Sequence, residues 1–116
     1  MTLIEKILFL MLLFTSANSQ AQDISIQNGF ITGNTFRAME KASKNVYVTG
    51  LLDGMLLAPL YGAPEKNLQI LASCTVNMTG QQLVAIFEKF LTNHPERWNQ
   101  SMHIIGYSAM HKICIK

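Results

Sequence analysis

Apolar residues recur at three- and four-residue steps between residues 79 and 93, which is the spacing of one face of an α-helix. The apolar positions are Leu83, Ile86, Phe87, Phe90 and Leu91. Thr79 with Gln82 three residues later is the signature of a capping box, which predicts where the helix begins. Pro95 disfavours helical geometry at His94, so the helix ends near Asn93. We therefore predict an amphipathic helix from about residue 80 to residue 93.

A second helix is predicted between Asn45 and Leu60, where small and apolar residues share one face. Gly50 and Gly54 lie on that face, one turn apart. A glycine inside a helix costs about 1 kcal/mol in helix propensity. We therefore expect both glycines to serve packing, by letting a neighbouring helix of the bundle approach closely. Asp53 interrupts the apolar segment and is either solvent-facing or a partly buried carboxylate bonded to a neighbour.

The remaining segments predict two further helices. A last helix is expected from Pro95 to Cys114, with apolar residues on one face at Trp98, Met102, Ile105, Ala109 and Ile113. Residues 22–44 form a weakly defined arm followed by a short helix that ends near residue 43. Residues 60–78 are expected to be a connection with a single helical turn over Glu65 to Ile70. The expected fold is all-α, a small bundle of about four helices.

The first twenty-one residues have the layout of a secretory signal peptide. Ile7 to Phe14 is an unbroken run of eight apolar residues, and Ser19-Gln20-Ala21 places small residues at −3 and −1 of a cleavage site before Gln22. Eight apolar residues fall far short of the ~20 that span a bilayer. We therefore expect residues 22–116 to form an exported, periplasmic protein with no membrane span in the mature chain.

Cys74 and Cys114 are the two cysteines of the sequence. In an oxidising compartment, two cysteines in a small domain indicate one disulfide, so we expect these two to be bonded. The formal net charge is only +2, which gives no basic stripe for nucleic acid and excludes it as an expected partner. Charged residues make up 14% of the chain, and this low share leaves few polar groups from which to build a catalytic site.

Enzyme motifs are missing from the sequence. There is no G-x-S-x-G, no phosphate-binding glycine loop and no H-E-x-x-H. His103 and His111 could join the two cysteines around a metal ion, but the C-x-x-C pairing that makes zinc spacing specific is missing. We therefore predict that the protein is not an enzyme and has no catalytic residues, no metal site and no cofactor.

Three motifs and the two cysteines form a pattern that points to one family. They are Tyr47-x-x-Gly50-x-x-x-Gly54, Cys74, Thr79-x-Gln81-Gln82-Leu83, Phe90-Leu91-x-x-His94-Pro95-Glu96 and Cys114. The pattern covers roughly residues 45–116 and resembles the Rap/Tai immunity family, periplasmic partners of type VI secretion amidase toxins. The resemblance implies a small, α-helical homodimer that inserts a protruding loop into the active-site cleft of a peptidoglycan-cleaving amidase. The family's cysteine pair falls on Cys74 and Cys114, and its glycine helix falls on Gly50 and Gly54.

The loop from Tyr61 to Lys66 is the candidate for contact with such a partner. Tyr61 offers an aromatic anchor next to Gly62, close to Glu65 and Lys66. A helical scaffold that is cross-linked by a disulfide holds a loop rigidly, which reduces the conformational entropy lost on binding. The alternative is that this segment is an ordinary solvated connection. For the protein as a whole, the alternative function is a small periplasmic stress-protection chaperone or a general binding protein.

Overall fold

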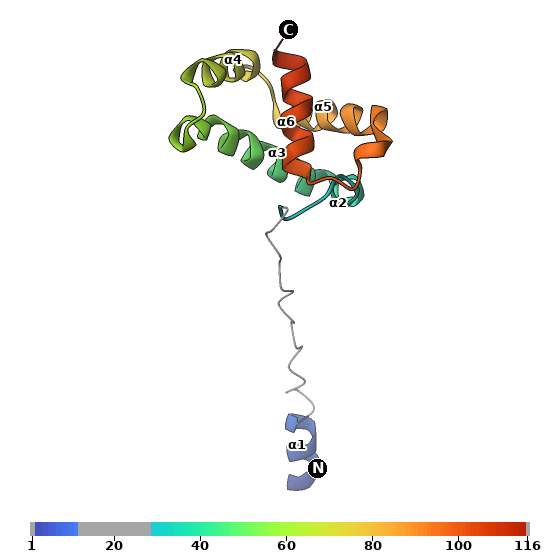
Figure 1. Cartoon of the computed structure of the whole chain (residues 1–116). Coiled ribbons are helices and arrows are strands. Elements are labelled where there is room, and N and C mark those ends of the chain that lie inside the picture. The colour runs from blue at the N-terminus through green and yellow to red at the C-terminus, as the bar shows by residue number, and fades with distance from the viewer. Residues whose placement is uncertain (1, 12–28, 116) are drawn as a thin grey trace.

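A computed structural model describes residues 2–11 and 29–115 of the chain (Figure 1). The helical elements, in chain order, are α1 (Leu3–Met11), α2 (Gly33–Ala38), α3 (Lys41–Leu56), η2 (Ala58–Tyr61), α4 (Glu65–Thr75), α5 (Gly80–Asn93), η3 (Pro95–Arg97) and α6 (Met102–Cys114). The two η elements are short 3-10 helices. The described residues contain no strand, although Thr32 and Ser101 form an isolated β-bridge. The predicted all-α class is confirmed.

Helix α1 falls inside the predicted signal peptide, whereas the predicted cleavage site before Gln22 lies outside the described residues. Within the described ranges, no single helix has the length and apolar character needed to cross a bilayer. Helices α4 and α5 meet that length and composition test only as a pair, and the pair is bent by 107°.

The amphipathic helix α5 forms where the sequence predicts it. The Thr79 side-chain oxygen accepts a hydrogen bond from the Gln82 backbone N–H at 3.2 Å, and Gln82 Oε1 accepts one from the Thr79 backbone N–H at 2.7 Å. These two bonds satisfy backbone donors that the first turn of a helix leaves unpaired. The predicted capping box and both ends of this helix are therefore confirmed.

The hydrophobic core lies where α5 packs against α3 and α6. Phe87 of α5 is 1% exposed, and its ring centroid lies 6.3 Å from that of Phe36, which α2 delivers to the core. Tyr47 of α3 also packs against Phe36, with ring centroids 5.9 Å apart, and partial burial raises the pKa of the Tyr47 hydroxyl. Four side chains of α6 complete the core: Met102, Ile105, Ala109 and Met110.

The last helix begins at Met102, so the predicted start at Pro95 is wrong. Pro95 instead opens the 3-10 turn η3, and the following backbone pairs with the segment around the start of α2. The bonds run from Gly33 N–H to Gln100 O (3.1 Å), from Asn34 N–H to Trp98 O (2.9 Å) and from Met102 N–H to Ile31 O (2.8 Å). Because these backbone groups bond to another segment, residues 98–101 do not enter a helical ladder. Trp98 therefore lies outside the final helix.

The predicted connection over residues 60–78 contains a complete helix, α4, rather than a single turn. Thr75 is the one buried residue of α4, and its hydroxyl donates to the Leu71 carbonyl at 2.9 Å. Leu71 itself is partly buried against the core. Because so few residues of α4 are buried, its sequence shows little apolar periodicity. The helix is stabilised by packing against α3 and α6 rather than by an amphipathic pattern of its own.

Gly50 and Gly54 lie on an open side of α3. A Cβ added to either glycine would meet no described atom within 4 Å, so the predicted close approach of a neighbouring helix to this pair is wrong for the described chain. Asp53 is exposed, as in the solvent-facing alternative. The close approach occurs at Gly106 instead, where an added Cβ would lie 2.6 Å from Leu51 Cδ2 and 3.1 Å from the ring of Phe87.

Gly50→Ala and Gly54→Ala are each expected to raise the free energy of unfolding by about 0.5–1 kcal/mol, because alanine has the higher helix propensity. The matched control is Gly106→Ala, which is expected to destabilise the protein because its Cβ would crowd the side chains beside it. Urea denaturation of the three variants measures these differences. A loss of stability at Gly50 or Gly54 would contradict the open environment of α3.

Candidate binding site

The connection between α3 and α4 is a compact turn at one end of the helical domain (Figure 1). η2 continues directly from α3, and Gly62 then adopts a φ of +95°, a left-handed conformation that favours glycine. The Gly62 N–H donates to Pro59 O at 3.1 Å, and the Ala63 N–H donates to Ala58 O at 3.2 Å. The turn is therefore ordered by its own backbone hydrogen bonds.

This turn carries the two most exposed large apolar side chains among the described residues. Tyr61 is 87% exposed and Leu60 is 78% exposed. Glu65 and Lys66 are also exposed, but they belong to the first turn of α4 rather than to a loop. The predicted contact residues, Tyr61 and Gly62 with Glu65 and Lys66, therefore lie together at one exposed end of the α3–α4 pair. Apolar groups gathered at an exposed projection are typical of a contact site.

A disulfide joins α4, the helix that follows the turn, to α6. Cys74, near the end of α4, is bonded to Cys114, at the end of α6, with Cα atoms 5.6 Å apart. The predicted pairing is confirmed. The bond ties α4 to a helix of the core, while the turn stands at the opposite end of α4. The turn is therefore carried on a covalently restrained scaffold, which lowers the entropy that binding would cost.

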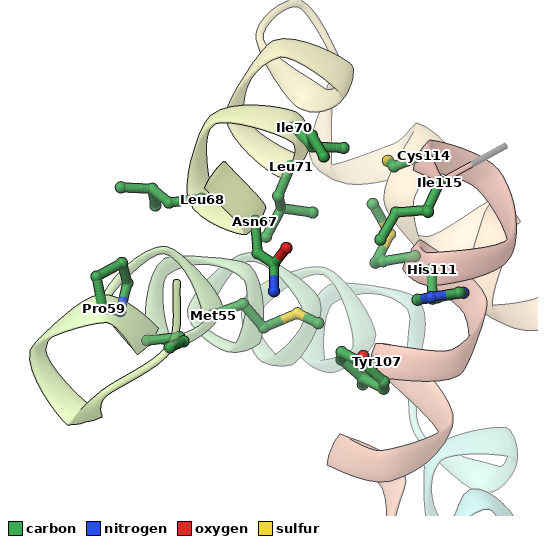
Figure 2. Close-up of a pocket in the computed structure, with 13 residues that line it drawn as sticks. Met55, Pro59, Asn67, Leu68, Ile70, Leu71, Tyr107, His111, Cys114 and Ile115 are labelled. Atoms are coloured by element: carbon green, nitrogen blue, oxygen red, sulfur yellow. The ribbon is translucent and has the colours of Figure 1, made fainter. Parts of the chain in front are cut away.

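An apolar hollow of about 150 Å³ lies beside the turn, between the end of α3, α4 and α6 (Figure 2). Ala58 and Pro59 of the turn form part of its wall. Its other apolar lining includes Met55 of α3, Leu71 of α4, and Tyr107 and Ile115 at the α6 side. The sequence analysis missed this hollow. Its lining comes from four separate elements, α3, η2, α4 and α6, and the sequence predicts α4 only as a connection.

His94 lies at the junction of α5 and η3. Its Nδ1 is 3.1 Å from Glu96 Oε1, and its ring centroid is 4.3 Å from that of Phe90. A hydrogen bond to its own backbone, together with the one to His94, lowers the pKa of Glu96. These contacts fix the geometry of a helix junction. In the part of the chain that the structure describes, no group of three or more His, Cys, Asp or Glu residues is placed to hold a metal ion.

Comparisons of the chain with protein-family models, with curated proteins and with solved structures found no match. The resemblance to the Rap/Tai family therefore rests on sequence motifs alone. Each motif has a structural part in this fold: Tyr47 packs beside the core, Thr79 caps α5, and His94 with Glu96 forms the junction after it. Motifs of this kind bear on the fold more directly than on the function.

Proposed function

We propose that this protein is a periplasmic immunity protein that binds and inhibits a cell-wall amidase delivered by type VI secretion. Three features support the proposal: the motif resemblance, the signal-like layout of residues 1–21, and a disulfide, which is typical of an oxidising compartment. In this proposal, the turn between α3 and α4 enters the active-site cleft of the amidase, and the protein acts as a homodimer.

The observation that carries the proposal is the exposed turn on its restrained scaffold. Tyr61 and Leu60 make few contacts with their own chain, so they contribute little to folding and are free to fill a partner's pocket. Large aromatic side chains are the commonest anchors of protein–protein interfaces. Because the turn is already ordered, little of that binding energy is lost in ordering it.

Isothermal titration calorimetry of the oxidised protein against a periplasmic amidase toxin, preferably the product of a neighbouring gene, tests the proposal. We expect a dissociation constant in the nanomolar range, at roughly −12 kcal/mol, and loss of peptidoglycan hydrolysis at one equivalent of protein per active site. A folded, oxidised protein that neither binds this amidase nor protects cells from it would overturn the proposal for that toxin.

Tyr61→Ala is expected to weaken binding of the amidase by about 30-fold or more, the effect of removing an interface anchor worth about 2 kcal/mol. The stability of the free protein should barely change, because Tyr61 is 87% exposed. Val76→Ala is the matched control: Val76 is 74% exposed but lies beyond the far end of α4, so its loss should leave the affinity unchanged. Equal affinities for wild type and Tyr61→Ala would remove the turn from the interface.

The alternative function is that of a stress-protection chaperone or a general binding protein, which also uses exposed apolar surface. Val46 and Val76 supply such surface away from the turn. A chaperone would suppress aggregation of unrelated denatured proteins. The same Tyr61→Ala variant separates the two functions, because binding spread over many side chains is insensitive to the loss of one.

A further inference from the structure

The hollow beside the turn has the size of a single side chain. Its volume of about 150 Å³ matches that of an engineered cavity in another protein that binds benzene. It is well below the range of about 300 Å³ and upward that is typical of drug-sized ligands. The hollow therefore suits one aromatic or branched aliphatic group rather than a whole cofactor.

Three lining residues carry polar side-chain atoms, namely Asn67, Tyr107 and His111, and Asn67 is the one amide among them. The carboxamide of Asn67 points into the hollow between Met55 and Leu71 (Figure 2). It makes no side-chain hydrogen bond to any residue that the structure describes. An amide side chain offers donors and an acceptor together, which is the same pair of functions that a backbone peptide group carries. An apolar group attached to a peptide group fits both features at once.

The charge of the lining favours a neutral occupant. No lysine, arginine, aspartate or glutamate lines the hollow. His111 also lines the hollow, so a fatty carboxylate is the competing ligand, and burying its charge against the otherwise apolar lining is costly. The wall formed by Ala58 and Pro59 is also continuous with the turn that carries Leu60 and Tyr61. A protein that binds the turn therefore contacts the segment that forms part of the wall of the hollow.

We propose that this hollow receives one neutral apolar side chain of the partner protein, while Asn67 pairs with the peptide group next to that side chain. The partner is then held in two ways, by the turn that enters it and by the side chain that it inserts in return. The identity of that partner rests on the function proposed above, but the binding chemistry of the hollow does not.

N-acetyl-L-leucinamide is the probe, because it joins one branched apolar side chain to peptide groups. In NMR titrations of the oxidised protein, we expect saturable shifts of the Asn67 side-chain amide and of the Leu71 and Met55 methyl groups. The dissociation constant should be on the order of millimolar, as expected for so small a ligand. N-acetylglycinamide, which lacks the side chain, should shift none of these signals. Hexanoate tests the lipid alternative, and tighter binding of hexanoate than of the leucinamide would overturn the proposal.

Asn67→Ala should weaken binding of the probe about fivefold, the effect of one lost hydrogen bond. Gln69→Ala, which removes an exposed amide from the same helix but outside the hollow, is the matched control and should have no effect. Unchanged probe affinity in Asn67→Ala would overturn the assigned pairing.

Ala58→Phe should fill the hollow from its wall and abolish probe binding, whereas Ala72→Phe, on the exposed side of α4, should not. Both variants are checked for folding by circular dichroism. The same pair tests the complex: if the amidase binds wild type and Ala58→Phe equally well, the hollow is not part of the interface, although the proposed function stands. If the amidase does not bind at all while the probe does, the proposed function fails and the peptide site stands.

Discussion

The double variant Cys74→Ser/Cys114→Ser is expected to lose about 4 kcal/mol of unfolding free energy. The disulfide closes a loop of 40 residues, and the entropy of closing a loop of that length accounts for about this amount. A small domain has only about 5–15 kcal/mol in total, so the variant should unfold at much lower urea concentration. The measurement is urea denaturation followed by circular dichroism, with linear extrapolation to water.

Two further samples separate the covalent bond from the substitutions themselves. Wild-type protein in a reducing agent should unfold at about the same urea concentration as the double variant, because both lack the bond. Ser73→Ala, which changes an exposed neighbour of Cys74, should stay within about 0.5 kcal/mol of oxidised wild type. Equal stability of the oxidised and reduced protein would show that the bond contributes nothing to the fold.

Phe87→Ala is expected to cost about 3–5 kcal/mol, the usual loss when a buried phenylalanine is replaced by alanine. Phe87 is 1% exposed and lies in the core where α3, α5 and α6 meet, in ring contact with Phe36 of α2 and beside Gly106. The loss of buried apolar surface and the cavity left by the missing ring both lower the free energy of unfolding. Thermal and urea denaturation of the purified variant both measure the loss.

Phe30→Ala is the matched control for that substitution. Phe30 is 67% exposed, so removing its ring should change the free energy of unfolding by no more than about 0.5 kcal/mol. If Phe87→Ala proved as mild as Phe30→Ala, the core would lie elsewhere than at the junction of α3, α5 and α6.

The sequence predicts α5 closely because three independent local signals agree there: the capping box at Thr79, the apolar stripe and the stop before Pro95. It predicts α6 only in part. Pro95 is compatible with a helix start, but the backbone that follows pairs with residues 31–34, and such a distant partner leaves no local signal. The same limit applies to α4, whose narrow stripe becomes helical through contacts with α3 and α6.

For the candidate site, sequence reasoning selects a segment that is exposed in the structure, but it does not predict the form of that segment. Tyr61 and Gly62 are recognisable because an aromatic residue beside a glycine and a proline stands out in a connection. The 3-10 turn, the hollow behind it and the inward direction of Asn67 depend on how three helices meet, which residue spacing does not encode. For the paired glycines, the sequence predicts a contact that the structure does not show. Gly50 and Gly54 suggest a close helix contact, and the close contact occurs instead at Gly106.

The sparse burial of α4 also has a dynamic consequence. With Thr75 as its one buried residue, α4 can open locally at a lower free energy than the core needs to unfold, so its amide hydrogens should exchange with solvent before those of α5. The disulfide holds the last turn of α4 to α6, and the hydrogen-bonded turn holds the first turn of α4 to α3, so this opening lies between two fixed ends of the helix. Because α4 forms one wall of the hollow, a bound side chain would slow that opening.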